Sequence, residues 1–357
     1  MTFLVLPETE GVPMAQPGEI AAMRRALDAA RMACTRPFPN PFVGCVLLDS
    51  GGNELALGVH RGAGTAHAEA DALNRAGDRA RGATAIVTLE PCNHSGRTGP
   101  CSKALIAAGV ARVVYAQSDP NPIATGGAAT LLAAGIDVEG GVLATESEAM
   151  NAIWTHSIMR GRPFVTWKYA ATIDGRVAAP DGTSQWITGA EARRDVQALR
   201  AEADAIMVGT GTVLADNPRL TLRGEDDVPL PYGVQPLRVV VGETRLPDDL
   251  NIWNEDAPTI QIRSQSPSDV LKALDGEEIR HVWLEGGPRL SGAFLDSGLV
   301  DRVIGYITPA VLGAGIAAAE GSAKTLNDLS RFAFTDVHRI GQDIRVMAQP
   351  STTERSV

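Results

Sequence analysis

Apolar residues recur along the first half of the chain at spacings that predict alternating helices and strands. Within residues 18–34, Ile20, Met23, Leu27 and Ala30 follow the period of a helix. The Pro-rich sequence TRPFPNPF ends that helix, because proline does not continue one. The pattern then predicts strands and helices in turn, with strands at 43–49, 83–92 and 111–119 and helices at 67–77 and 101–110. Such alternation is typical of a layered α/β domain.

A predicted helix at residues 150–163 leads into a second series of elements. An amphipathic helix is expected at 189–203, and residues 204–216 read as a strand that ends in a glycine-rich loop. Further strands are predicted at 164–178, 237–242, 259–263, 281–287 and 302–313. The two series meet near residues 147–162, so we expect one domain over 18–147 and another over 163–350.

Length, composition and charge restrict the class of protein. A chain of 357 residues exceeds one ordinary core, and 44% apolar with 21% charged residues is typical of globular proteins. The net charge of −10 argues against nucleic acid or an anionic membrane as a partner. We read no secretory signal and no run of membrane-spanning length, and four cysteines do not form a disulfide framework. A cytoplasmic enzyme is the simplest expectation.

Four side chains in the first half have the chemistry of a catalytic zinc site. His67 and Glu69 lie at a predicted helix start, and Cys92 and Cys101 flank a polar loop. One imidazole and two thiolates leave a zinc position open for water, and a free glutamate beside it can shuttle protons. Zinc deaminases share this pattern, H-x-E followed by P-C-x-x-C, in which zinc lowers the pKa of the water. We therefore predict one Zn²⁺ held by His67, Cys92 and Cys101, with Glu69 as the catalytic residue.

The spacing of the cysteines departs from the short motif. Eight residues rather than two separate Cys92 from Cys101. Pro100 and the following helix return Cys101 to the site, and the positive end of that helix favours a thiolate. A lone H-x-E or a buried pair of cysteines is more often structural, but their joint occurrence favours metal. His94, inside the loop, is either a substrate contact or a solvated loop histidine.

The motifs PNPFVGCVL, HAEADAL and EPCNHSGRTGPC resemble the cytidine-deaminase-like domain of the bifunctional riboflavin-biosynthesis deaminase/reductase family. The resemblance implies a three-layer fold and places Asn40 against the pyrimidine, and the long loop that contains His94 is the form typical of that family. The chain departs from the family at Asn93 and Gly99, where serine and proline are usual, and neither position is a predicted ligand.

Arginines and a glycine turn in the second half indicate a binding site for phosphate groups. Arg200, Arg219 and Arg223 could converge as a phosphate clamp, whereas Arg193 and Arg194 fit an exposed helix face. In VWLEGGPRLSGAFL a strand, a Gly-Gly turn and a helix that begins near Leu290 follow one another. Exposed amides at such a helix start hold phosphates well. The sequence is not a Rossmann fingerprint.

This half resembles the reductase domain of the same family, which implies a dihydrofolate-reductase-like fold and NADPH. Thr172 stands where the family often has serine, and a hydroxyl is kept. By position, the resemblance places a set of residues at the cofactor: Ala170, Trp186, Thr212, Asp216, Gly287, Pro288, Arg289, Leu290, Ser291, Gly292 and Ala293. Another set would hold the substrate: Lys168, Asp174, Ser184, Arg200, Leu220, Arg223 and Glu285.

What the resemblance implies is two consecutive steps of riboflavin biosynthesis. The first is zinc-dependent hydrolytic deamination of 2,5-diamino-6-(5-phosphoribosylamino)pyrimidin-4(3H)-one, and the second is NADPH-dependent reduction of its ribosyl side chain to ribityl. The partner would be a small pyrimidine ribosyl phosphate, and members of the family tend to form homo-oligomers. The main alternative is a nucleoside or nucleic-acid deaminase with an added binding domain. Two others are a zinc-stabilised scaffold, with a fourth protein ligand, and a chain with only one active domain.

Overall fold

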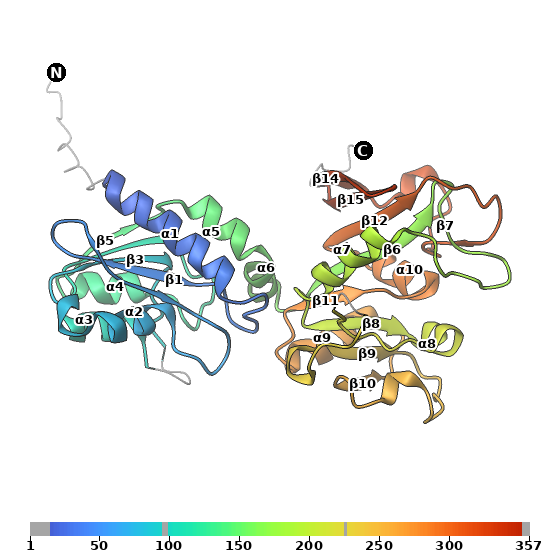
Figure 1. The fold of residues 1–357 in the computed structure, drawn as a ribbon, viewed down its shortest axis with the longest axis horizontal. Helices are drawn as coiled ribbons and strands as arrows, with labels where there is room; N and C mark the ends of the chain where they lie inside the picture. The colour runs from blue at the N-terminus through green and yellow to red at the C-terminus, as the bar shows by residue number, and fades with distance from the viewer. Residues whose placement is uncertain (1–14, 95–98, 225–226, 352–357) are drawn as a thin grey trace, which may run out of the picture. The chain divides into compact units, whose positions relative to one another are not determined.

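The computed structural model describes residues 15–94, 99–224 and 227–351, which form two compact units, 1–159 and 160–357. Each unit is built on its own sheet, with five strands in the first and eight in the second (Figure 1). A further pair of short strands lies in the second unit.

The first unit is a sheet covered by helices on both faces, in strand order β2-β1-β3-β4-β5. β1 pairs with β2 and β3 in antiparallel fashion, while β3, β4 and β5 are parallel. The strands are β1 Gly44–Leu48, β2 Glu54–Val59, β3 Thr84–Leu89, β4 Arg112–Gln117 and β5 Asp137–Gly140. The helices are α1 Pro17–Ala33, α2 Ala68–Ala76, α3 Cys101–Ala108, α4 Gly127–Ala133, α5 Ala144–Met150 and α6 Ala152–Arg160, with a 3₁₀ turn η1 at Gly77–Ala80.

Alternate residues of the strands face two separate cores, which makes three layers. Val46 and Leu48 pack with α1 and α5 on one face. Cys45 and Leu47 pack with α2, α3 and α4 on the other. This arrangement follows from the two-residue period of a strand, because both faces of the sheet are apolar and need a helix layer. The predicted three-layer domain is confirmed.

Glycine lets α2 approach the sheet closely. A Cβ at Gly58 would lie 2.2 Å from the carbonyl oxygen of Ala68 and 2.3 Å from the amide nitrogen of Ala72. No side chain fits between strand and helix at this point. The first turn of α2, which carries His67 and Glu69, is thereby held against the sheet.

The second unit has a mostly parallel sheet in the order β10-β9-β8-β11-β6-β12-β15-β14, with antiparallel pairing only at β12-β15-β14. Its strands are β6 Phe164–Thr172, β8 Ala205–Gly209, β9 Leu237–Val241, β10 Thr259–Ile262, β11 His281–Leu284, β12 Arg302–Thr308, β14 Phe332–Ile340 and β15 Asp343–Pro350; β7 Arg176–Ala178 pairs with β13 Ile316–Ala317. Its helices are α7 Ala190–Arg200, α8 Thr210–Asp216, α9 Pro267–Gly276 and α10 Pro288–Asp296, with 3₁₀ turns η2 Tyr232–Val234, η3 Asn251–Trp253 and η4 Leu326–Asp328.

Helices also cover both faces of this sheet. α9 and α10 pack on one face through Val270, Leu274 and Phe294. α7 and α8 contribute Val196 and Val213 to the core on the other face. The carboxyl ends of β8, β11 and β6 are neighbours, so the loops after these strands share one edge of the sheet.

Three sequence predictions in this unit are wrong in detail. Residues 164–178 form β6 and β7 rather than one strand, because the chain turns at Gly175 with φ +78°. Residues 210–216 are the helix α8, although threonines and glycine there favour a loop. α10 begins at Pro288, not near Leu290, with proline in the first helical turn. The hairpin of β14 and β15 was not predicted.

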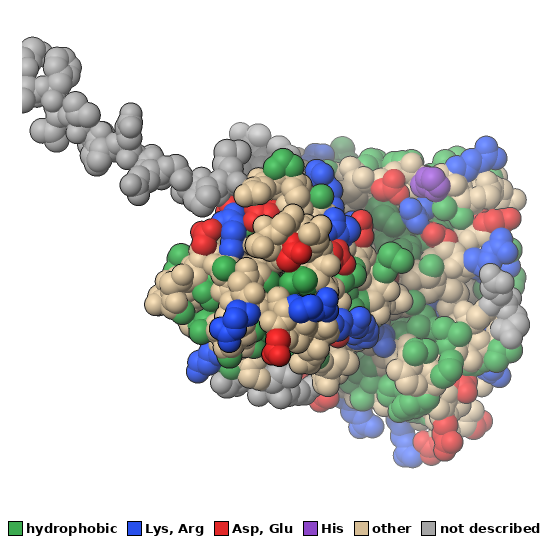
Figure 2. Space-filling model, turned by 60° about the vertical axis from the view of Figure 1, so that its left-hand side comes forward, with side chains coloured by type: hydrophobic (Ala, Val, Ile, Leu, Met, Phe, Trp, Pro, Cys, Tyr) green, Lys and Arg blue, Asp and Glu red, His purple; other side chains and the backbone are tan. Residues whose placement is uncertain are grey.

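The surface has mixed charge. On the face shown in Figure 2, Lys and Arg side chains are interspersed with Asp and Glu. Among the described residues, no helix has both the length and the apolar character needed to cross a membrane.

Candidate active sites

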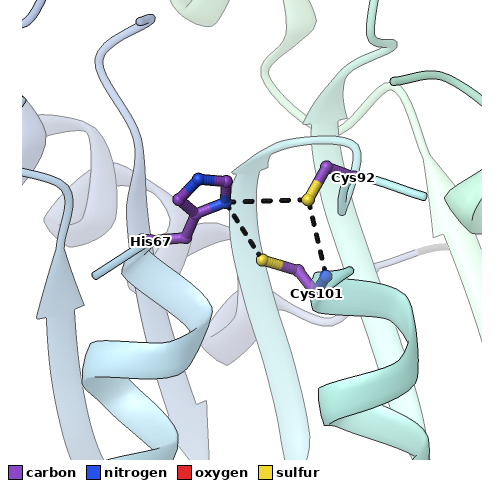
Figure 3. Close-up of side chains that lie close together, drawn as sticks. All are labelled: His67, Cys92 and Cys101. Carbon is purple, nitrogen blue, oxygen red and sulfur yellow. Dashed lines mark hydrogen bonds between the residues drawn. The ribbon is translucent and has the colours of Figure 1, made fainter. Parts of the chain in front are cut away.

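The predicted zinc ligands come together at one end of the first unit. His67 is the N-cap residue of α2, Cys92 follows β3, and Cys101 is the first residue of α3. The Nδ1 atom of His67 lies 3.6 Å from the Sγ atom of Cys92 and 3.3 Å from that of Cys101. Figure 3 shows the three side chains converging from the two helix starts and the loop after the strand.

This geometry fits a shared zinc ion. Tetrahedral zinc with bonds of about 2.3 Å to sulfur and about 2.0 Å to nitrogen separates those two atoms by about 3.5 Å. The observed separations of 3.3 and 3.6 Å are close to that value. Within the described part of the chain, these three residues are the one group whose donor atoms could hold a metal, all within 4.8 Å of one another. Among residues 15–94, 99–224 and 227–351, no fourth protein ligand joins this group, as the scaffold alternative would require.

The pKa values of the two thiols are shifted in opposite directions. The pKa of Cys92 is lowered to about 4, chiefly because the Cys101 thiol hydrogen-bonds to its sulfur, with further help from His67 and the Cys101 amide. The same pairing, together with burial, raises the pKa of Cys101. Without a metal, one of the two sulfurs keeps its proton. A bound divalent cation would stabilise both as thiolates.

Glu69 lies beside the group on the first turn of α2 and is 3% exposed. Burial, and then the negative charge at Cys92, raise its pKa to about 7. Its carboxyl group also interacts with the Cys101 thiol. A carboxyl group with a pKa near neutrality both takes up and releases protons readily, as a proton shuttle must.

His60 belongs to this site, although the sequence assigned it no role. It is 3% exposed, its Nε2 atom lies 2.9 Å from the side-chain nitrogen of Asn40, and its ring lies edge-to-face on His67 with 5.4 Å between centroids. Burial lowers its pKa, which favours the uncharged ring. A histidine that follows a strand by one residue and precedes the H-x-E motif is the signal that could have indicated it.

Glu90 supports the turn that carries Cys92, and it too was missed. Its buried carboxylate accepts hydrogen bonds from the amides of Asp119, Gly126 and Ala128. Those bonds hold the loop that follows β4 against the zinc ligands.

His94, a predicted substrate contact, is half-buried, and its Nδ1 atom has no hydrogen-bond partner within the described residues. A buried, unpaired nitrogen is free to meet a ligand.

The second unit has a cavity of about 310 Å³ between the β6–β7 turn, the loop before α7 and the loop after β12. Ser184 and Trp186, predicted at substrate and cofactor respectively, line this cavity. Arg193 stacks over the Trp186 ring at 4.5 Å and donates to the carbonyl oxygen of Thr188. The expectation of an exposed face therefore fails for Arg193, whereas the side chain of Arg194 is 69% exposed. The cavity is lined by Thr172, Ala178, Ala179, Thr183, Ser184, Gln185, Trp186, Ile187, Thr308, Ala310 and Leu312.

A hydrogen bond joins the two glycine-containing segments predicted for the cofactor, which are α8 and the start of α10. The amide of Gly287, the N-cap of α10, donates to the Thr212 hydroxyl on α8 at 3.2 Å. Asp216 lies exposed at the end of α8, and Ala170 is half-buried on β6. Ser291 and Gly292 are buried, and the backbone carbonyl oxygen of Glu320 would lie 1.9 Å from a Cβ at Gly292. The neighbours Pro288, Leu290 and Ala293 are half-buried, whereas Arg289 is exposed.

The guanidinium of Arg200 forms an ion pair with Glu285 and is not an unpaired cation. Its guanidinium donates to both carboxylate oxygens of Glu285, and each of the two side chains is 11% exposed. Trp283 donates to the same carboxylate. The pKa of Glu285 is lowered to about 2 despite burial, because Arg200 and then Lys168 are close. Burial lowers the pKa of Lys168, a residue of β6.

The other members of the proposed clamp have different surroundings. Arg223 is half-buried and donates to Asp227 at 2.8 Å, and Arg219 is exposed. Leu220 between them is buried with φ +50°. Because Arg200 already pairs with Glu285, its charge is balanced within the protein, and the convergence of the three arginines on a phosphate stays a prediction.

Asp174 ties the β6–β7 turn to the loop after β12. Its carboxylate accepts from the Thr172 hydroxyl at 2.6 Å and from the amides of Leu312 and Gly313 at 3.1 and 2.8 Å. These bonds, the Thr172 hydroxyl first, lower its pKa to about 2. Because Thr172 and Leu312 line the cavity, Asp174 shapes the cavity wall.

Replacing Asp174 by alanine should therefore raise the KM for NADPH or for the reductase substrate about threefold to tenfold, with a smaller change in kcat, because a loosened wall binds less well. Steady-state kinetics of NADPH oxidation measure this. Asp248→Ala, at an exposed aspartate away from the cavity, is the matched control. An unchanged KM in Asp174→Ala would contradict the role.

Comparison with known families gives two matches. Residues 18–117 match the cytidine and deoxycytidylate deaminase zinc-binding region, and residues 163–346 match the RibD C-terminal domain. The first range contains His67, Glu69, Cys92 and Cys101, and the second contains the cavity and the glycine turns.

Individual relatives cover both units. The riboflavin biosynthesis protein RibD of Mycobacterium tuberculosis is 46% identical over 326 residues, which is 90% of this chain and 95% of that protein. The RibD of Escherichia coli is 41% identical over 90% of this chain and 96% of its own length. Among solved structures, Acinetobacter baumannii RibD superposes with a TM-score of 0.85 at 37% identity, covering 94% of this chain and 99% of the other. A Thermotoga maritima deaminase/reductase gives a TM-score of 0.82 at 32% identity, with the same two coverages.

Proposed function

Because the chain belongs to the RibD family of riboflavin-biosynthesis enzymes, we propose that its two units act in turn on one pyrimidine ribosyl phosphate. The chain is a zinc-dependent deaminase and an NADPH-dependent reductase, as its two domain matches indicate. The Thermotoga maritima relative is described as a diaminohydroxyphosphoribosylaminopyrimidine deaminase and 5-amino-6-(5-phosphoribosylamino)uracil reductase. We assign these substrates to this chain, with the deaminase over 18–147 and the reductase over 163–350.

One observation carries the deaminase half, namely a buried glutamate beside three ligand atoms arranged for zinc. Zinc, when bound by His67, Cys92 and Cys101, lowers the pKa of a water molecule. Glu69 would take one proton from that water and pass it to a ring nitrogen as the water oxygen adds to C2, and would then carry the second proton from the new hydroxyl to the departing amine. The C2–N bond of the pyrimidine breaks, a C2–O bond forms, and ammonia leaves. Asn40 and His94 hold the ring.

In the reductase half, NADPH supplies the hydride, and the chain supplies orientation. We assign the cofactor to Ala170, Trp186, Thr212, Asp216 and the start of α10, where a helix N-terminus after a glycine turn suits phosphate. We assign the ribosyl phosphate to Ser184, Leu220, Arg223, Lys168 and the Arg200–Glu285 pair, with Asp174 shaping the wall. We assign the sugar hydroxyls to the Lys168 amine, which lies close to Glu285.

A coupled assay on the purified chain tests both halves. Ammonia release and NADPH oxidation are followed separately, first with the diaminopyrimidine ribosyl phosphate and then with its deaminated product. We expect NADPH oxidation with the second substrate alone, and with the first substrate only after ammonia is released. Ammonia release without any NADPH oxidation would favour the alternative of a nucleoside or nucleic-acid deaminase, which the match to the RibD C-terminal domain disfavours.

Arg223→Ala should raise the KM for the deaminated substrate by about 10-fold to 100-fold, because a charged hydrogen bond to phosphate is lost. The KM for NADPH and the rate of ammonia release should not change. Arg194→Ala on the exposed side of α7 is the matched control. The assignment is wrong if the loss falls on NADPH instead.

We also propose that the enzyme acts in the cytoplasm as a homo-oligomer. The four cysteines are free thiols, as expected in a reducing compartment. Light scattering of the full chain measures the oligomeric state.

A further inference from the structure

His60 connects Asn40 to the zinc group. Nδ1 of its ring lies 3.0 Å from the carbonyl oxygen of Ala66, and Nε2 lies 2.9 Å from the side-chain nitrogen of Asn40. The ring packs against the ligand His67 only through an edge-to-face contact. His60 is therefore buried between a predicted ligand and a predicted substrate contact, with both nitrogens occupied.

The hydrogen-bond partners determine which nitrogen of His60 carries the proton. The carbonyl oxygen of Ala66 can only accept, so Nδ1 must be the donor. Thr65 agrees with this, because its hydroxyl already donates to the carbonyl oxygen of Gly62 at 2.7 Å and can only accept from Nδ1, 3.4 Å away. With the proton on Nδ1, Nε2 of the neutral ring has a free lone pair and acts as an acceptor.

An acceptor at Nε2 determines the orientation of the Asn40 amide. Only the NH₂ group of Asn40 can donate to Nε2, so the amide oxygen must point away from His60. We propose that His60 is a positioning residue of the deaminase, which turns the Asn40 oxygen toward the bound pyrimidine as a hydrogen-bond acceptor for a ring or exocyclic N–H. This inference rests on the proposed function of the first unit.

The orientation has a consequence for substrate choice. An asparagine that turns freely presents an oxygen or an NH₂ group with equal ease, and so accepts rings with either pattern. With its amide held by His60, Asn40 presents its carbonyl oxygen to the pyrimidine. A pyrimidine that has no N–H at that position leaves this oxygen, and its own acceptor opposite it, without a hydrogen bond, which costs binding free energy. His60 thus supplies selectivity without touching the substrate.

The test compares His60→Phe with Asn40→Ala and with the double variant. Phenylalanine keeps the ring that packs on His67 and removes both hydrogen bonds. We expect His60→Phe to bind one zinc per chain and to raise the deaminase KM for the diaminopyrimidine about tenfold, with a smaller effect on kcat. His60→Gln, whose amide oxygen can accept from Asn40, should recover part of the loss. If His60 acts through Asn40, the double variant is no worse than Asn40→Ala alone.

A buried histidine in the other unit provides the matched control. His281 is 1% exposed and likewise has both nitrogens paired, with Thr166 and with the carbonyl oxygen of Glu202. His281→Phe should leave the deaminase KM unchanged. The inference is overturned if His60→Phe has the wild-type KM, if it loses zinc and His60→Gln does too, or if the effects of His60→Phe and Asn40→Ala add. Failure of the proposed function would instead appear as wild-type protein that releases no ammonia.

Discussion

Glu69→Gln should lower the rate of ammonia release by about 10²-fold to 10⁴-fold, the range attributed to a positioned general acid–base. The glutamine side chain has nearly the same size and fills the same buried position, but it cannot carry a proton from water to the amine. Because Glu69 is not a ligand of the metal group, zinc content should stay at one ion per chain. NADPH oxidation with the deaminated substrate should continue at the wild-type rate. Ammonia release, NADPH oxidation and metal content are measured on one preparation.

Glu146→Gln is the matched control for this change, since Glu146 is an exposed acidic residue on α5 of the same unit. It should leave both activities intact. Ammonia release by Glu69→Gln at more than about a tenth of the wild-type rate would mean that another group carries the proton. Loss of zinc together with activity would mean that Glu69 supports the metal site and is not a shuttle.

Arg200→Met should destabilise the chain by about 3 to 5 kcal/mol and abolish NADPH oxidation, because the buried carboxylate of Glu285 loses its hydrogen-bonded cation and keeps only Lys168 nearby. Methionine has a similar length and keeps the apolar contacts of the arginine stem. Ammonia release serves as an internal reporter, since its residues lie in the other unit. Urea unfolding and the two rates are measured together. Arg194→Met, on the same helix but with a 69% exposed side chain, should change the free energy of unfolding by less than about 0.5 kcal/mol.

A double variant separates stability from binding at this pair. Arg200→Met combined with Glu285→Leu removes both charges, and replacing a whole buried ion pair by apolar residues is often neutral or stabilising. The double variant should regain most of the lost free energy of unfolding and still fail to oxidise NADPH. Recovery of the reductase activity would show that the pair has only a structural role. A wild-type stability for Arg200→Met would show that solvent reaches Glu285 freely.

The zinc site and the family could be predicted from sequence because their signals are local. His67 and Glu69 are two positions apart, Pro91 and Cys92 follow a strand, and Cys101 begins a helix. Each fragment has a geometry that turn and helix chemistry set within a few residues. The unusual loop between the cysteines did not mislead the prediction, since only the directions of its ends matter to the metal. The zinc and NADPH cofactors and both enzyme activities were predicted correctly.

Partners far apart in the chain were not predictable in the same way. Arg200 and Glu285 are 85 positions apart, and both were expected to hold the substrate rather than to pair with each other. Nothing near Arg200 in sequence indicates that the loop after β11 will place a carboxylate beside it. The helix α8 was also missed. Its own residues disfavour a helix, and the packing of Val213 in the core beside β8 stabilises it.

The sequence alone determined many of the helices and strands and which chemical groups the chain contains, because hydrophobic periodicity, caps and metal-binding motifs act over a few residues. The tertiary structure alone decided which of those groups are partners. The order of the strands set the pairing of Arg200 with Glu285, the close approach of α2 to the sheet, and the position of His60 between Asn40 and His67. Electrostatic and hydrogen-bond partners depend on distances in space, and those exist only once the sheets have assembled.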